Sequence, residues 1–110
     1  MRVIVERKLF AVVAADMVGF SRLIEHDEIN LLSRQKNQLN TIIKPEIENY
    51  NGEIIKTTGD GFLATFPSAL DAVQSSISIQ NGIYENELEK PNDKKIRYRI
   101  GIHVGDVVLD

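Results

Sequence analysis

Residues 52–66 read GEIIKTTGDGFLATF, and this stretch predicts the part of the fold around which the rest is arranged. Two runs rich in β-branched and aromatic residues flank Gly59-Asp60-Gly61, and a short Gly/Asp turn between two such runs is typical of a β-hairpin. The hairpin would place the carboxylate of Asp60 at its tip. Asp is also a common turn residue because its side chain bonds to its own backbone. On this motif alone, Asp60 therefore has a structural interpretation as well as a functional one.

The composition indicates one soluble globular domain. The 110 residues carry a net charge of −3 and 43% of them are hydrophobic, which suits a single core. No cysteine is present, so disulfides, thiolate metal sites and a thiol nucleophile are excluded. The longest apolar run, Leu9–Ala15, is far shorter than the roughly 20 residues that span a bilayer, and no signal peptide is legible. We expect a cytoplasmic chain with no membrane contact, and its mild acidity disfavours nucleic acid as a partner.

The first half of the chain predicts one strand and two helices. The run Leu9–Ala15 predicts a strand that is buried on both faces and ends at Asp16. A tight turn at Gly19 then opens a short helix. Asp27 is expected to cap a longer helix that continues almost to the hairpin. Pro45 lies inside that helix and is expected to kink it or to begin its last turns, because proline removes one helical hydrogen bond.

The second half predicts a helix end, another helix and a strand. Asn51-Gly52 should end the long helix, since both residues tolerate a left-handed cap. After the hairpin, Ser68 is expected to cap an amphipathic helix that runs toward Glu89. Residues 96–109 begin with clean alternation of polar and apolar positions and predict a strand, with a bend or bulge at Gly105-Asp106.

This element order predicts an α+β fold, the ferredoxin-like βαββαβ arrangement, in which helices cover one face of an antiparallel sheet. The first strand would pair with the hairpin, so Asp16 and Asp60 should converge. Two neighbouring carboxylates repel unless a cation lies between them, and Mg²⁺ or Mn²⁺ takes such ligands together with phosphate oxygens. The helix N-terminus at Phe20-Ser21, just after Gly19, offers backbone N–H groups that suit a phosphate.

Three stretches resemble the catalytic domain of class III adenylate/guanylate cyclases. They are residues 10–23, with ADMVGFS at 15–21, residues 52–66, with KTTGDG at 56–61, and residues 99–106, which read RIGIHVGD. The resemblance covers nearly the whole chain in the right order. It is therefore more specific than any single motif.

The resemblance implies an enzyme that converts ATP into cyclic AMP and pyrophosphate by attack of the ribose 3′-hydroxyl on the α-phosphate. In the family, carboxylates that match Asp16 and Asp60 bind two Mg²⁺ or Mn²⁺ ions, and the carbonyl of Met17 would be a further ligand. The remaining matched residues have two roles. Phosphates would be bound by the amides of Gly19, Phe20 and Ser21, and the purine would be recognised by Lys56. Lys at this position is adenylate-type, whereas guanylate cyclases usually carry Glu.

The resemblance also implies that residues 1–110 are a single domain, the N-terminal part of such a catalytic domain. In the family, a second purine-selecting residue and an Asn and an Arg that stabilise the transition state follow beyond the position of Asp110. The family's active site forms between two catalytic domains, so a homodimer is expected. We expect very weak or no cyclase activity from these residues alone, because lost transition-state donors cost orders of magnitude in rate.

Alternatives remain for single residues and for the whole chain. Lys56 can be a solvated residue on an open sheet face, Phe20 an ordinary core aromatic and Gly19 an ordinary turn residue. The chain can also be a non-catalytic nucleotide- or metal-binding module that dimerises and regulates a partner. An RNA-binding domain of the same topology would need displayed aromatic residues, and the acidic charge and missing basic patch disfavour it.

Overall fold

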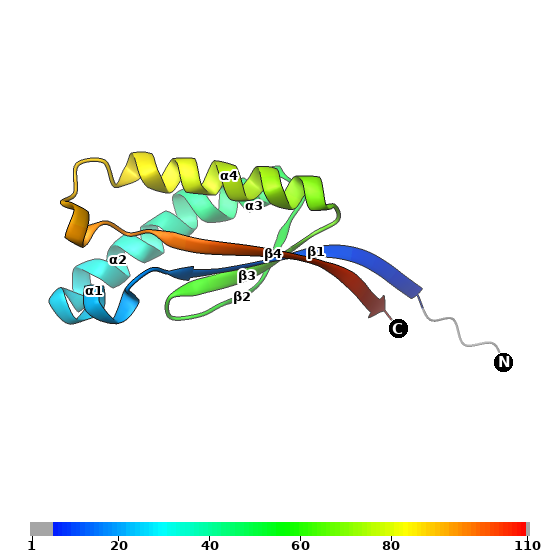
Figure 1. Ribbon diagram of the computed structural model, residues 1–110, viewed down its shortest axis with the longest axis horizontal. Coiled ribbons are helices and arrows are strands. Elements are labelled where there is room, and N and C mark those ends of the chain that lie inside the picture. Colours follow the sequence, from blue (N-terminus) through cyan, green and yellow to red (C-terminus); the bar gives the residue numbers. More distant parts are fainter. Residues whose placement is uncertain (1–5, 110) are drawn as a thin grey trace.

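The structure, a computed structural model, describes residues 6–109 and contains a four-stranded antiparallel sheet with the strand order β2-β3-β1-β4 (Figure 1). The helices and strands, with a π-helical turn and a 3₁₀ turn between them, have the following bounds: β1 (Glu6–Met17), α1 (Phe20–His26), α2 (Glu28–Gln38), π-helical turn (Leu39–Ile43), α3 (Lys44–Asn49), β2 (Glu53–Thr57), β3 (Gly61–Phe66), α4 (Ala69–Asn86), 3₁₀ turn (Asn92–Lys94) and β4 (Tyr98–Leu109). The predicted α+β, ferredoxin-like arrangement is confirmed.

Helices α2, α3 and α4 cover one face of the sheet, and we call the other face the open face (Figure 1). Successive side chains of a strand point to opposite faces. In β1, Val13 is only 1% exposed on the helix-covered face, whereas Ala14 is exposed on the open face. The prediction that Leu9–Ala15 is buried on both faces is therefore wrong. The run is apolar throughout, but helices cover one side of it only.

The long helix is interrupted where the sequence predicts a disturbance. Asp27 caps α2 as predicted, because its Oδ1 accepts a hydrogen bond of 3.3 Å from the backbone N–H of Asn30. The π-helical turn Leu39–Ile43 then separates α2 from α3, and Pro45 lies in the first turn of α3. Proline has no N–H to donate, and its ring crowds the carbonyl four residues earlier. The helix accommodates this by widening one turn just before the proline.

Helix α3 ends as the Asn-Gly pair predicts. Asn51 adopts a left-handed conformation with φ 66°. The backbone N–H of Gly52 donates to the carbonyl of Ile47 at 2.9 Å, and that of Asn51 donates to the carbonyl of Glu48 at 3.1 Å. These two bonds form a Schellman motif. They direct the chain from α3 straight into β2.

Helix α4 begins as predicted and ends early. The Ser68 hydroxyl accepts a hydrogen bond of 3.0 Å from the backbone N–H of Asp71, which confirms the predicted cap. The helix stops at Asn86 instead of running to Glu89. The next residue, Glu87, is only 3% exposed, so the chain turns to carry a charged side chain inward.

Buried Glu87 joins three segments of the chain. One of its carboxylate oxygens pairs with the guanidinium of Arg34 and accepts a hydrogen bond of 2.6 Å from the backbone N–H of Ile96. The other oxygen accepts a hydrogen bond of 3.2 Å from the amide of Gln38. A buried carboxylate needs such partners, because an unpaired buried charge is strongly unfavourable. The network therefore ties α2 and the end of α4 to the segment that leads into β4.

Strand β4 runs beside β1 without a bulge. It pairs with β1 without a register shift, from Tyr98 opposite Met17 to Leu109 opposite Glu6. Of the predicted bend or bulge at Gly105-Asp106, the bulge is therefore wrong. A bulge requires an extra residue in one strand, and a glycine alone does not supply one. Here every residue of β4 has a partner in β1, so the pairing continues through Gly105. The irregularity lies instead between Ile54 and Lys56 of β2, so Ile55 is the bulged residue.

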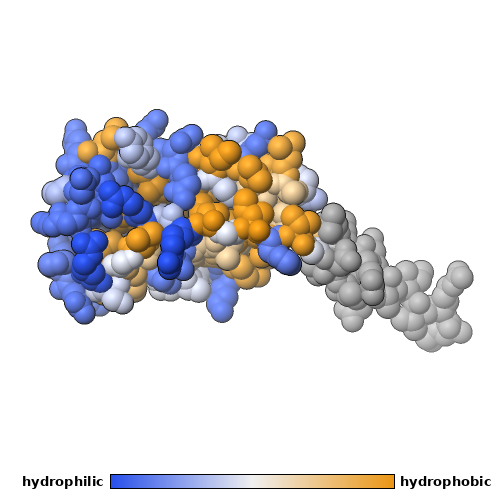
Figure 2. Space-filling model, viewed as in Figure 1, coloured by the Kyte–Doolittle hydropathy of each residue, from blue (hydrophilic) through white to orange (hydrophobic). Residues whose placement is uncertain are grey.

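Apolar side chains are exposed along α4 and the edge strand β4 (Figure 2). They follow helical spacing on α4 and alternate along β4: Leu70, Val73, Ile77, Ile102 and Val104. This strip is not covered by residues 6–109, and exposed apolar surface of this kind is often a contact surface. Within the same residues, no helix has both the length and the apolar character that crossing a membrane requires.

Gly52 offers a test of how closely the residue before β2 packs against β3. A Cβ at this position would lie 2.3 Å from Cε1 of Phe66, and Phe66 is a core residue with 1% exposure. Overpacking of this kind costs about 1–3 kcal/mol. We expect Gly52→Ala to lower the free energy of unfolding by this amount in urea denaturation.

The matched control is Gly59→Ala, at the tip of the same hairpin. A Cβ there would meet no atom within 4 Å, and the residue does not have a positive φ. We expect its free energy of unfolding to stay within about 0.5 kcal/mol of the wild-type value. Equal losses in the two variants would contradict the packing described here.

Candidate active site at the hairpin tip

The end of β1 lies directly against the tip of the β2–β3 hairpin. Asp16 is opposite Gly61 in the β1–β3 ladder, and the backbone N–H of Met17 donates to the carbonyl of Asp60 at 2.7 Å. Gly61 permits this approach, because a Cβ on it would lie 1.8 Å from the carbonyl oxygen of Ala15. The structure thus brings together the two acidic residues that are separated by the long helix in the sequence.

The two carboxylates have different partners. Both oxygens of Asp16 are bound by Arg99, whose Nε donates to Oδ1 at 2.9 Å and whose terminal nitrogen donates to Oδ2 at 3.2 Å. Oδ1 of Asp60 accepts a bond of 3.3 Å from the hydroxyl of Thr58. The Asp16 side chain remains 44% exposed. The carboxylate of Asp16 is therefore reachable from solvent, and its present partner is the side chain of Arg99.

Arg99 is a site residue that the sequence reasoning missed. It lies on β4 opposite Asp16, and its side chain is 73% exposed. The hydrogen bond and then the charge of Asp16 raise the pKa of Arg99, and the charge of Asp60 raises it further. Both carboxylates thus act on one guanidinium. In the sequence, Arg97 and Arg99 are two positions apart, and this spacing indicates that both lie on the same face of a strand. The sequence does not indicate which residue of β1 lies opposite Arg99, because that depends on the register of the two strands.

The donor set at the tip suits a hard divalent cation. Asp16 and Asp60 offer carboxylate oxygens, the ligands that Mg²⁺ and Mn²⁺ prefer. Among residues 10–105, whose side chains the structure describes, His, Cys, Asp and Glu side chains form no group of three or more that could hold a metal. Two carboxylates alone leave most of the coordination shell to other oxygens, such as those of phosphate and water. The ion pair between Arg99 and Asp16 shows that the Asp16 carboxylate already binds one positively charged group.

The turn after β1 presents the N-terminus of α1. Gly19 has φ 64°, a left-handed conformation that glycine adopts readily. The first amides of a helix have no acceptor within it, and within the described chain no side-chain hydrogen bond caps α1. The amides of Phe20 and Ser21 thus stand beside the end of β1. The ring of Phe20 packs against the core, so its structural interpretation holds as well.

Lys56 lies on the open face but apart from Asp16. It is opposite Leu63 of β3, which is opposite Ala14 of β1, and residues that face each other across a ladder share one face. Neighbouring strands are about 4.8 Å apart, so two strand spacings separate Lys56 from β1. Its side chain is exposed. One chain therefore does not bring Lys56 onto the Asp16–Arg99 pair.

Tyr98 lies directly behind the site, one residue before Arg99, and faces the helices. Its burial, followed by the charges of Glu87 and Asp60, raises the pKa of the phenol to about 12. The side chain is 5% exposed. At neutral pH Tyr98 is therefore a protonated hydroxyl that can donate a hydrogen bond.

Comparison with known proteins identifies the family of this chain. The sequence profile described as "Adenylate and Guanylate cyclase catalytic domain" matches residues 6–110. The chain is 45% identical to a solved "Adenylate/Guanylate Cyclase/Hydrolase" from Silicibacter pomeroyi, with a TM-score of 0.85 over 97% of this chain and 62% of that one. It is 33% identical to "Putative adenylate cyclase 3" of Rhizobium meliloti (strain 1021), over 96% of this chain and 18% of that protein.

A more distant solved structure shows how far the fold extends. The guanylyl cyclase Cya2 has a TM-score of 0.77 at 22% identity, over 94% of this chain and 57% of that one. At such identity the likeness concerns the fold alone. The fold is thus shared by proteins named for either nucleotide, and this chain spans less than two thirds of the length of each of these relatives.

The buried phenol of Tyr98 predicts a pH-dependent loss of stability. An unfolded tyrosine loses its proton near pH 10.0, whereas folded Tyr98 keeps it to about pH 12. Its contribution is present below pH 10 and is lost as the pH rises through this window, because the folded state then binds more protons than the unfolded state. We expect a decrease of about 2–3 kcal/mol in the free energy of unfolding of the wild type, measured by urea denaturation at each pH.

Two variants isolate this contribution from other alkaline effects. Tyr98→Phe should lack the component, whereas Tyr84→Phe should keep it, because Tyr84 is 66% exposed. The decisive quantity is the difference between wild type and variant across the pH series. A Tyr98→Phe variant that loses stability as steeply as the wild type would contradict the assignment.

Proposed function

This chain belongs to the adenylate and guanylate cyclase catalytic domain family, and we propose that it acts within an adenylate cyclase, which converts ATP into cyclic AMP and pyrophosphate. The observation that carries the proposal is the contact between the end of β1 and the hairpin tip, where Met17 N–H bonds the Asp60 carbonyl at 2.7 Å. Asp16 lies opposite Arg99, and the turn that carries Asp60 lies against the end of the same strand. We further propose that the chain is the N-terminal part of a larger catalytic domain, since it covers 62% of one solved relative.

Asp16 and Asp60 would hold two Mg²⁺ or Mn²⁺ ions, with the backbone carbonyl of Met17 as a further ligand. When bound, such ions favour deprotonation of the ribose 3′-hydroxyl and offset charge on the triphosphate. The hard oxygen donors at the tip support this role. The carboxylates of the chain position the reacting groups, and the open face keeps them accessible to a nucleotide.

Arg99 and the start of α1 would bind the triphosphate. A guanidinium donates well to phosphate oxygens, and the exposed side chain of Arg99 is free to turn from Asp16 once another cation satisfies that carboxylate. The amides of Gly19, Phe20 and Ser21 suit a second set of phosphate oxygens, because the positive end of a helix dipole favours anions. The negative charge of the triphosphate would then be bound by Arg99 on β4 and by the amides at the start of α1.

Lys56 would select adenine, in a homodimer. The Lys56 ammonium donates hydrogen bonds and accepts none, which suits the ring acceptor of adenine. Lys56 is exposed on the open face and separated from Asp16 by two strand spacings. This separation supports a site to which one chain contributes the carboxylates and its partner contributes Lys56. Within residues 6–109 no helix covers the open face, so a second chain has access to it.

Cyclic nucleotide formation by the protein that carries this chain tests the proposal. With ATP and Mn²⁺ we expect cyclic AMP, and we expect Asp60→Asn to lower its rate of formation by at least about a hundredfold, the scale of lost electrostatic stabilisation in an active site. The same assay with GTP tests the adenine preference. Direct titration with Mn²⁺ should show weakened binding in the variant.

Asp93→Asn is the matched control, because Asp93 is exposed in the 3₁₀ turn far along the chain from the hairpin. Its activity should equal that of the wild type. Undiminished activity of Asp60→Asn would refute the assigned role. Mn²⁺ and ATP binding without any cyclic product would favour the non-catalytic module instead.

A further inference from the structure

The tip of the β2–β3 hairpin has a backbone conformation that two-residue loops seldom adopt. The backbone N–H of Thr58 donates to the carbonyl of Gly61 at 2.9 Å, which leaves Gly59 and Asp60 as the two loop residues. Such loops prefer turns in which the first central residue has a positive φ, because these turns match the twist of the strands. Neither Gly59 nor Asp60 has a positive φ. The shape of the tip therefore depends on bonds from other parts of the chain.

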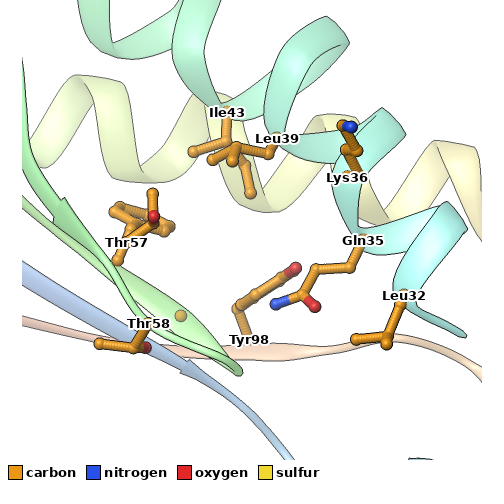
Figure 3. A pocket seen from close by; sticks show the side chains of 10 residues that line it. Leu32, Gln35, Lys36, Leu39, Ile43, Thr57, Thr58 and Tyr98 are labelled. Carbon is orange, nitrogen blue, oxygen red and sulfur yellow. The ribbon is translucent and has the colours of Figure 1, made fainter. Parts of the chain in front are cut away.

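Two such bonds hold the tip. The side-chain amide of Gln35, on α2, donates to the carbonyl of Gly59 at 2.9 Å. The backbone N–H of Met17, at the end of β1, donates to the carbonyl of Asp60 at 2.7 Å. Figure 3 shows the Gln35 side chain extending from α2 into a pocket of about 160 Å³ between this helix and the hairpin. Because the pocket leaves a gap in the packing there, the Gln35 bond connects the helix directly to the tip.

These two bonds fix the peptide groups on both sides of Asp60. The carbonyl of Gly59 belongs to the peptide group before Asp60, and the carbonyl of Asp60 belongs to the peptide group after it. Peptide groups are planar, so only φ and ψ of Asp60 allow rotation between them. With both planes held, the direction in which Cβ leaves the backbone is held too. The position of the carboxylate then depends on the rotation of its own side chain, which the Thr58 hydroxyl contacts at 3.3 Å.

We propose that Gln35 is a positioning residue for Asp60, whose carboxylate it directs toward the proposed metal ions through the Gly59–Asp60 peptide group. The inference rests on the proposed function, in which Asp60 binds Mg²⁺ or Mn²⁺. Gln35 lies on the helix-covered side of the sheet, so it acts through the backbone and touches neither the ions nor the nucleotide. Metal ligands must be held to within about 0.5 Å of their working geometry. Residues that orient ligands therefore affect metal affinity strongly.

The side chain of Gln35 and its place on α2 suit this role. Its amide donates a hydrogen bond without carrying a charge, whereas a Lys or Arg would add positive charge near two cations. The helix is a firm support, because Arg34 pairs with buried Glu87 and Gln38 is 1% exposed. Sites supported by rigid elements keep their geometry better than sites supported by loops.

Gln35→Met tests the role, because methionine has a similar length and cannot donate a hydrogen bond. In Mn²⁺ titrations of the protein that carries this chain, we expect the variant to bind at least about tenfold more weakly than the wild type. Two controls should bind as the wild type does. Gln74→Met makes the same change at an exposed position of α4. Gly52→Ala crowds Phe66 and so destabilises the hairpin without removing the Gln35 bond.

Hydrogen exchange in the absence of metal gives a second measurement. The amides of Met17 and Thr58 are protected by the bonds that they donate to carbonyls of the tip. In Gln35→Met we expect both amides to exchange about three- to tenfold faster, because one hydrogen bond fewer opposes local opening. Gln74→Met should leave both rates unchanged.

The outcomes separate this inference from the proposed function. Equal Mn²⁺ affinity of Gln35→Met and the wild type, beside weakened binding by Asp60→Asn, would overturn the role of Gln35 and leave the proposed function intact. Equal affinity of Asp60→Asn and the wild type would refute both. Unchanged exchange at Met17 and Thr58 in Gln35→Met would also overturn the inference, because the bond would then not hold the tip.

Discussion

The position of β1 between β3 and β4 is the constraint on which the rest of this structure depends. As a central strand, β1 sets Asp16 opposite Gly61 on one side and Arg99 on the other. Its alternation also separates two functions of the sheet. Charged groups gather on the open face, while Tyr98 and Phe62 turn toward the helices and line a pocket. A shift of one residue in either ladder would move the side chains of the shifted strand to the opposite face.

Local sequence patterns predicted the elements that depend on local chemistry. The hairpin, the caps at Asp27 and Ser68 and the left-handed residue Asn51 each follow from a few adjacent residues and their backbone preferences. From these elements the topology followed, and with it the placement of the turn that carries Asp60 against the end of β1, where Asp16 lies. Elements with strong turn and cap signals are those whose boundaries a single sequence can indicate best.

Features set by packing and register were not predictable in the same way. The both-face burial of Leu9–Ala15 was wrong because an apolar run does not reveal how many helix layers will cover it. The bulge at Ile55 and the unbroken register at Gly105 depend on the partner strand. Arg99 was missed because its contact spans 83 positions of sequence. Glu87 ends α4 early through partners from two other segments.

Anomalous diffraction from crystals grown with Mn²⁺ and a non-hydrolysable ATP analogue would test the central claim most directly. The account predicts manganese peaks within coordination distance of both Asp16 and Asp60, with the guanidinium of Arg99 turned from Asp16 toward the phosphates. Manganese bound away from these carboxylates, or bound by only one of them while Arg99 stays on Asp16, would contradict it.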